Sequence, residues 1–219
     1  MKRQSPGIAG LIDHTFLKPA GDRNAVRRLC AEAKRAHFAS VCVNPCEVAF
    51  CARALRGSGV KVCTVIGFPL GQCTLRATCF EALDAIQADA DELDLVVNQR
   101  LLKYSPGACE ANLLQWVRTC RTLRSDLVLK LILECCNLAR AEIVRGCRIA
   151  KEAGFDFVKT STGFGAGGAT VEDVALMRRT VGPEMGVKAA GGIRDLATAR
   201  AMVAAGATRI GTSAGLNMV

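Results

Sequence analysis

Residues 156–168, DFVKTSTGFGAGG, combine the signals that decide the fold class. The segment from Phe155 to Val158 has the apolar character of a buried strand, and Lys159 continues it. Hydroxyl residues and a glycine-rich turn follow at once. A second stretch, GVKAAGGIR at residues 186–194, repeats the same order of apolar residues, lysine and glycines. Both stretches therefore predict a strand that ends in a glycine-rich loop and contains a lysine where its neighbours indicate core.

Short apolar runs of strand length recur along the whole chain. They are rich in Val, Ile and Leu, as buried parallel strands are. The predicted strands are residues 11–17, 41–44, 63–68, 93–98, 129–134, 157–162, 187–192 and 209–213.

Helical patterns lie between these runs. Residues 22–37 place their apolar side chains on one helix face: Val26, Leu29, Cys30 and Ala33. Thr170 is a good N-cap for a helix whose buried stripe is Val174, Met177 and Val181. A further helix is expected to begin at Asp195 and to end at Gly206.

Strands that alternate with helices predict parallel pairing through right-handed crossovers. Eight strands with seven crossovers fit a closed α/β structure, the (β/α)8 or TIM barrel. An open doubly wound sheet is the alternative, but it would favour a G-x-G-x-x-G motif after the first strand, and residues 11–21 contain none. No linker-like or low-complexity segment interrupts the chain, so we predict a single domain of residues 1–219.

Polar side chains are concentrated near the predicted carboxyl ends of the strands. In a barrel of this type these ends and the loops after them form the active-site face. The residues concerned are Asp13, Asn44, Asn98, Glu134, Thr160, Ser161, Thr162 and Ser213.

Lys159 and Lys188 fall on neighbouring predicted strands. Two ammonium groups in one pocket repel each other, so one amine is expected to lose its proton near neutral pH. A neutral amine can attack a carbonyl group and form a Schiff base. Asp94, in an otherwise apolar strand, could exchange protons with the lysines. The alternatives are that each lysine extends to solvent or pairs with a carboxylate, and that Asp94 forms a structural ion pair.

Three glycine-rich segments follow the last three predicted strands: residues 162–168, 189–194 and 209–215. Backbone N–H groups that glycine leaves accessible can bind phosphate, and barrels often bind phosphate in this region. These segments predict a phosphorylated substrate.

The chain carries a formal net charge of +9. Its arginines are scattered along predicted helices rather than interleaved with aromatic residues on one face, which argues against a nucleic-acid partner. The longest uncharged apolar run, from Val62 to Leu75, is too short to span a bilayer and contains Gly67, Pro69 and Gly71, so no membrane partner is expected.

The chain has 12 cysteines. Residues 1–10 show no signal peptide, and no paired C-x2-C motifs occur. We therefore interpret the cysteines as reduced core residues of a cytoplasmic protein rather than as disulfides or zinc ligands. No cofactor and no metal are expected.

The sequence resembles the deoxyribose-phosphate aldolase family of class I aldolases, which have a (β/α)8 barrel. The matching segments run in the family's order from residue 11 to residue 215, and FVKTSTGF with VKAAGGIR is the most specific pair. They are LIDHTFLKP, VCVNP, TVIGFPLG, ELDLVVN, LKLILE, FVKTSTGF, GVKAAGGIR and RIGTSAG. Two positions depart from the family pattern, with Thr78 in place of a lysine and Cys135 in place of a threonine.

The resemblance implies a role for each matching residue. Lys159 would form the Schiff base, Lys188 would assist it, and Asp94 would donate and accept protons. The residues implied in substrate and phosphate binding are Asp13, Thr15, Thr162, Gly163, Gly191, Gly192, Gly211 and Ser213.

The implied reaction is the reversible cleavage of 2-deoxy-D-ribose 5-phosphate to D-glyceraldehyde 3-phosphate and acetaldehyde, in deoxyribose catabolism. A homo-oligomer is compatible with the sequence. Two alternatives remain open: another Schiff-base lyase of the barrel class, such as a transaldolase-like enzyme, and a catalytically silent barrel that only binds a phosphorylated ligand.

Overall fold

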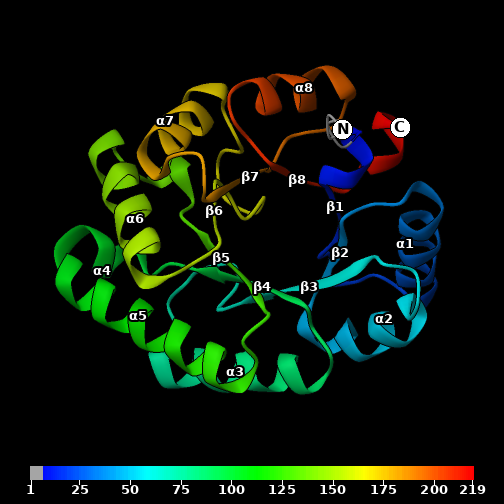
Figure 1. The fold of residues 1–219 in the computed structure, drawn as a ribbon, viewed down its shortest axis with the longest axis horizontal. Coiled ribbons are helices and arrows are strands. Elements are labelled where there is room, and N and C mark those ends of the chain that lie inside the picture. The colour runs from blue at the N-terminus through cyan, green and yellow to red at the C-terminus, as the bar shows by residue number, and fades with distance from the viewer. Residues whose placement is uncertain (1–6) are drawn as a thin grey trace, which may run out of the picture.

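The computed structural model describes residues 7–219, in which eight parallel strands close into a barrel in chain order (Figure 1). The predicted fold class is therefore confirmed, and the open doubly wound sheet is excluded. The predicted domain of residues 1–219 and the search for a signal peptide both include residues 1–6, which lie outside the described part. The strands are β1 (Ile12–Phe16), β2 (Ser40–Val43), β3 (Lys61–Ile66), β4 (Glu92–Val96), β5 (Val128–Ile132), β6 (Phe157–Lys159), β7 (Gly186–Ala190) and β8 (Arg209–Thr212).

The barrel closes through pairing of β8 with β1, in which Asp13 lies opposite Gly211. Seven crossovers carry the α-helices, which form a ring around the barrel (Figure 1). The helices are α1 (Arg23–Ala36), α2 (Val48–Leu55), α3 (Leu75–Gln87), α4 (Gln99–Tyr104), α5 (Pro106–Leu123), α6 (Arg140–Ala153), α7 (Val171–Val181) and α8 (Leu196–Ala204). The crossover between β4 and β5 holds two helices, α4 and α5.

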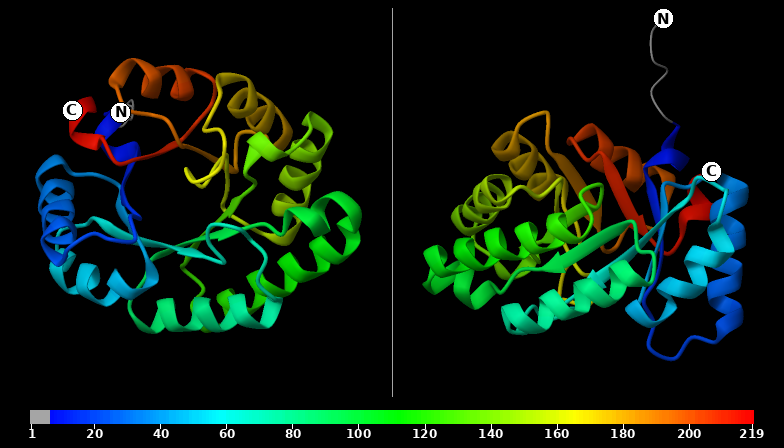
Figure 2. Two further views of the ribbon diagram at one scale, coloured as in Figure 1. Left: turned by 180° about the vertical axis from the view of Figure 1, so that it is seen from behind. Right: turned by 60° about the horizontal axis from the view of Figure 1, so that its bottom comes forward.

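Within residues 7–219, four short 3-10 helices accompany the larger elements: η1 (Ile8–Leu11), η2 (Pro45–Glu47), η3 (Cys135–Asn137) and η4 (Gly215–Met218). η1 and η4 contact each other, and the views in Figure 2 show these two segments side by side. Among residues 7–219, no helix has the length and apolar character needed to cross a membrane.

The predicted N-caps are confirmed at the residue level, whereas α8 ends at Ala204 with Ala205 as its C-cap, one residue before the expected Gly206. The Thr170 side chain accepts a hydrogen bond from the backbone N–H of Asp173 at 3.0 Å, and Asp195 accepts one from Thr198 at 2.8 Å. Each cap satisfies a backbone donor that the first helical turn leaves without a partner. The predicted apolar faces of α1 and α7 are buried against the barrel.

The main core lies between the barrel and the helices. It is aliphatic, with a stacked pair formed by Trp116 and Phe155. Eight of the twelve cysteines are buried, as expected for small core residues, but Cys46, Cys73 and Cys136 are exposed and Cys79 is half-buried, so the interpretation as core residues is wrong for these four. The departures Thr78 and Cys135 are buried too; the Thr78 hydroxyl donates to the carbonyl oxygen of Leu75 at 2.9 Å.

One expectation about strand ends is wrong. Asp13 is the second residue of β1 and lies near its amino end, because the strand continues to Phe16. The other polar residues expected near the carboxyl ends of strands lie there, one to three residues after the last residue of the strand.

Candidate active site

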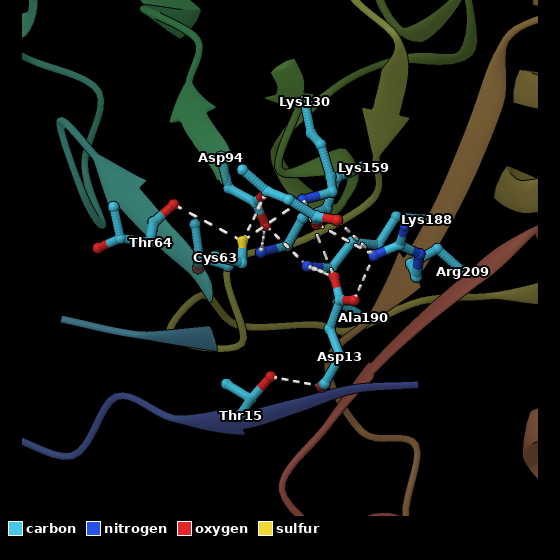
Figure 3. A network of polar contacts seen from close by, with 12 residues as sticks. Asp13, Thr15, Cys63, Thr64, Asp94, Lys130, Lys159, Lys188, Ala190 and Arg209 are labelled. Atoms are coloured by element: carbon cyan, nitrogen blue, oxygen red, sulfur yellow. Dashed lines mark hydrogen bonds and ion pairs between the residues drawn. The ribbon is translucent and has the colours of Figure 1, made fainter. Parts of the chain in front are cut away.

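Asp94 lies at the centre of the barrel interior and contacts three lysines (Figure 3). Its Oδ2 atom is 2.9 Å from Nζ of Lys159 and 2.8 Å from Nζ of Lys188. Its Oδ1 atom is 2.7 Å from Nζ of Lys130. The predicted trio of Lys159, Lys188 and Asp94 therefore meets in space. Both lysines are also paired with a carboxylate, which is one of the alternatives stated for them in the sequence analysis.

A second set of charged side chains lies toward the amino ends of the strands. Glu92 and Arg209 are the first residues of β4 and β8, and they contact each other at 3.0 Å. Arg209 also contacts Asp13 at 2.6 Å, and Glu92 contacts Lys130 at 2.6 Å. Asp13 in turn pairs with Lys188, which joins this lower set to the lysines around Asp94.

The ionised forms of the central groups stabilise one another. Burial alone would raise the pKa of Asp94, but the ammonium groups beside it, first that of Lys130 and also that of Lys188, more than offset this effect and hold it well below its usual range. Burial likewise disfavours the charge on Lys188, yet the carboxylates of Asp13 and Asp94 raise its pKa above that of an ordinary lysine. In this state Asp94 is a carboxylate and Lys188 is an ammonium ion.

A pocket of about 270 Å³ opens at the carboxyl ends of the strands. Among the three interior lysines, Lys159 alone lines it, because Lys159 is the last residue of β6 whereas Lys130 and Lys188 are the middle residues of their strands. Lys159 is thus the interior amine that a ligand in the pocket can reach, and it has the charged network beneath it.

The predicted binding residues also line this pocket, with one exception. Those on its wall are Thr15, Thr162, Gly163, Gly191, Gly192, Gly211 and Ser213. Asp13 is not among the lining residues; it is fully buried below them, in contact with Lys188 and Arg209. Lys18 and Arg194, which the sequence analysis did not single out, add two cations to the pocket lining.

The loops around the pocket pack closely on one another. Gly191 has a φ of +87° and its carbonyl oxygen accepts a hydrogen bond from Ala169, so the turn after β7 supports the loop after β6. A side chain at Gly211 would meet Cε of Lys188 at 3.1 Å. Gly211 therefore makes room for that lysine as well as lining the pocket.

Glu134 organises the loop that follows β6. Its carboxylate accepts hydrogen bonds from the backbone N–H and the hydroxyl of Thr162, and it lies against Gly165. Glu134 itself has a φ of +56°, an uncommon conformation for a residue other than glycine. The loop bearing Thr162 and Gly163 is thereby tied to the end of β5.

Three charged residues of the interior were not predicted from the sequence: Lys130, Glu92 and Arg209. The signal that could have found them is the one that identified Lys159, a charged residue within an apolar strand, as in LKLILE, ELDLVV and RIGTS. Lys130 and Glu92 are nearly inaccessible, with relative exposures of 0% and 2%. Charges so deeply buried need partners, and the barrel supplies them.

Two groups of side chains in the interior have the composition of metal ligands: Cys42, Cys63 and Asp94, and Asp13, Cys63 and Glu92. Each carboxylate in them already contacts at least one ammonium or guanidinium group. A divalent cation would therefore be brought among fixed positive charges, and these groups fit lysine and arginine better than a metal.

Comparisons with known proteins show what this chain is similar to in sequence and in fold. The family model described as DeoC/LacD family aldolase matches residues 8–219. The deoxyribose-phosphate aldolase of Bacteroides thetaiotaomicron is 54% identical over 213 residues, which are 97% of this chain and 89% of that protein. The enzyme of the same name from Thermoanaerobacter sp. is 50% identical over 212 residues, or 97% and 95% of the two chains.

Solved structures show the same similarity. The deoxyribose phosphate aldolase of Aeropyrum pernix, whose structure is described as tetrameric, superimposes with a TM-score of 0.89 at 34% sequence identity. The match covers 96% of this chain and 88% of that one.

Proposed function

The chain belongs to the DeoC/LacD family of aldolases, and on this premise we propose that it cleaves 2-deoxy-D-ribose 5-phosphate reversibly to D-glyceraldehyde 3-phosphate and acetaldehyde. The proposed intermediate is a Schiff base on Lys159. The observation that carries the proposal is the position of this amine, which lines the pocket while its Nζ atom lies 2.9 Å from the carboxylate of Asp94.

The proposed reaction begins with the uncharged amine of Lys159, which attacks the aldehyde carbon C1 of the open-chain sugar phosphate. Loss of water from the resulting carbinolamine gives a protonated imine. The imine accepts the electron pair of the C2–C3 bond when that bond breaks, and the C3 hydroxyl becomes the aldehyde of glyceraldehyde 3-phosphate. The remaining two-carbon enamine is protonated at C2, and hydrolysis of the imine releases acetaldehyde and restores Lys159.

Asp94 and Lys188 would move the protons in these steps. The carboxylate of Asp94 takes the proton of the C3 hydroxyl through a water molecule and returns a proton to C2 of the enamine. Lys188 is 2.8 Å from the same oxygen of Asp94 and replenishes that proton. Its charge also opposes protonation of Lys159, which keeps the nucleophile available.

The phosphate of the substrate would bind at the loops after β6, β7 and β8. The pocket wall there includes Gly163, Gly192 and Ser213, whose backbone N–H groups could bind phosphate. Positive charge is added by Lys18 and Arg194. Asp13 serves this site indirectly in the proposal, since it pairs with Lys188 beneath the pocket. The substrate partners are then small molecules, namely the sugar phosphate and the aldehydes.

We place the enzyme in the cytoplasm and in the catabolism of deoxyribose. The free thiols of all twelve cysteines support a reducing compartment. A homo-oligomer is consistent with the tetramer described for the Aeropyrum pernix relative.

Reductive trapping tests the proposed function. Borohydride added with acetaldehyde should attach a two-carbon group to Lys159, which peptide mapping by mass spectrometry locates. The variant Lys159→Met should give no adduct and no release of acetaldehyde from 2-deoxyribose 5-phosphate at any pH. Adduct on another lysine, or cleavage that persists in this variant, would refute the mechanism.

A further inference from the structure

The ionised side chains inside the barrel form a closed ring of alternating charge. Each member contacts one neighbour of opposite charge on either side. The order around the ring is Arg209, Asp13, Lys188, Asp94, Lys130, Glu92 and back to Arg209.

The ring is electrically balanced, with three carboxylates and three cations. Lys159 stands outside it. Its amine contacts Asp94 alone, at 2.9 Å, whereas Lys188 and Arg209 each contact two carboxylates and Lys130 contacts three, since it also lies 4.0 Å from Asp13 across the ring. A proton on Lys159 would therefore leave the buried cluster with one uncompensated positive charge, which is costly in a poorly solvated interior.

Glu92 and Arg209 complete this ring from the end of the barrel opposite the pocket. Neither residue lines the pocket, and both begin their strands. Arg209 is held further by the ring of Phe157, whose centroid is 5.3 Å away. We propose that Glu92 and Arg209 are positioning residues that balance the charge of the barrel interior, so that the reactive amine of Lys159 remains uncharged at neutral pH. This proposal rests on the proposed function, in which that amine is the nucleophile.

Two thiols also face the ring. Cys63 on β3 lies 3.2 Å from Asp94 and 3.4 Å from Lys130, and burial, its hydrogen bond with Cys42 and the charge of Asp94 raise its pKa, so this thiol is uncharged. The same hydrogen bond lowers the pKa of Cys42 on β2. Because Cys42 could carry a charge of its own, the experiment below includes a background in which it is replaced by serine.

The experiment compares the pH dependence of kcat/KM for three variants: Arg209→Met, Glu92→Gln and the double variant. Loss of Arg209 leaves an extra negative charge that favours a proton on Lys159, so the acid limb of the profile should move to higher pH by about one unit or more. Loss of the Glu92 charge should move it to lower pH. The double variant should return to the wild-type position, and Arg209→Lys should stay close to it.

The pair Arg121–Asp156 provides the matched control, because its ion pair of 2.7 Å lies outside the ring. Arg121→Met and Asp156→Asn should lower the melting temperature without moving the acid limb. The shifts caused by the ring variants should persist in a Cys42→Ser background, and their loss there would assign the titration to the thiol and overturn the proposal.

Shifts of the same sign in Arg209→Met and Glu92→Gln would also overturn the proposal, and unmoved profiles would show that the two residues serve stability alone. If the double variant does not fold, the comparison of Arg209→Met with Arg209→Lys still decides the point, because only the former should move the limb. Borohydride labelling of the wild type distinguishes failure of this proposal from failure of the proposed function. An adduct on Lys159 with unmoved profiles refutes this proposal, whereas no adduct on Lys159 refutes the proposed function itself.

Discussion

Replacing Lys188 by methionine removes a positive charge that shares an oxygen of Asp94 with the proposed nucleophile, while it retains much of the side-chain volume. Lys159 and Lys188 contact the same oxygen of Asp94, at 2.9 Å and 2.8 Å, so their nitrogen atoms are at most about 6 Å apart. At an effective dielectric constant of about 20, two unit charges at this separation repel each other by about 2.8 kcal/mol, equivalent to about two pH units.

The acid limb of kcat/KM in Lys188→Met should therefore move upward by about two pH units or more. Activity at neutral pH should fall, and part of it should return in alkaline solution, where Lys159 loses its proton even without help. The assay is a pH–rate series with 2-deoxyribose 5-phosphate, accompanied by a melting curve. The melting temperature should fall as well, because Asp13 and Asp94 each lose a buried partner, a change that typically costs about 3–5 kcal/mol.

Two other outcomes would refute the charge argument. If Lys188 acts only as a proton carrier, the variant will be equally poor at every pH. If Lys188 is only structural, the variant will melt earlier but retain the wild-type profile. An acid limb that does not move is therefore incompatible with the reasoning, even if the protein cleaves the proposed substrate.

The remaining predictions concern metal, phosphate, the loop after β6 and acid stability. Activity should survive EDTA; a loss that zinc or magnesium restores would reveal a metal site. Deoxyribose without its phosphate should have a kcat/KM lower by about 10- to 150-fold for each charge-assisted hydrogen bond lost, and equal values would exclude phosphate binding at the glycine-rich loops. Glu134→Gln should raise KM for the phosphorylated substrate about tenfold, because Thr162 loses a charged acceptor; an unchanged KM would show that the loop does not need it. Asp94 has a folded-state pKa below its ordinary value, so its stabilisation is complete above about pH 5 and is lost as pH falls through the folded pKa. The free energy of unfolding should fall on acidification, and Asp94→Asn should weaken this dependence; an equal slope would contradict the assignment.

Much of the fold could be predicted from local patterns. Each strand is a short apolar run and each crossover helix has a buried stripe, and signals such as the caps at Thr170 and Asp195 act within a few residues. The alternation of strand and helix then allows only a few fold topologies, since crossovers between parallel strands are right-handed. The same patterns identified Lys159, Lys188 and Asp94, because a charged residue in an apolar strand is visible without a structure.

The position expected for Asp13, near the carboxyl end of its strand, was wrong although the strand itself was predicted. Residues 11–17 predict a strand in which Asp13 is the third of seven residues and so already lies nearer the amino end. The pairing of β1 with β2 and β8 places it there, opposite Ser40 and Gly211 and below the pocket.

By itself, the sequence determined the order of strands and helices, the closed barrel they favour and the presence of Lys159 on the sixth strand, although it predicted that this strand would continue to residue 162 whereas β6 ends at Lys159. The tertiary structure alone decided which charges meet. Asp13 and Arg209 are 196 residues apart in the chain and contact at 2.6 Å, because β8 pairs with β1 when the barrel closes. Ion pairs inside the barrel depend on strand register and on which side chains point inward, and both are properties of the closed sheet rather than of any single segment.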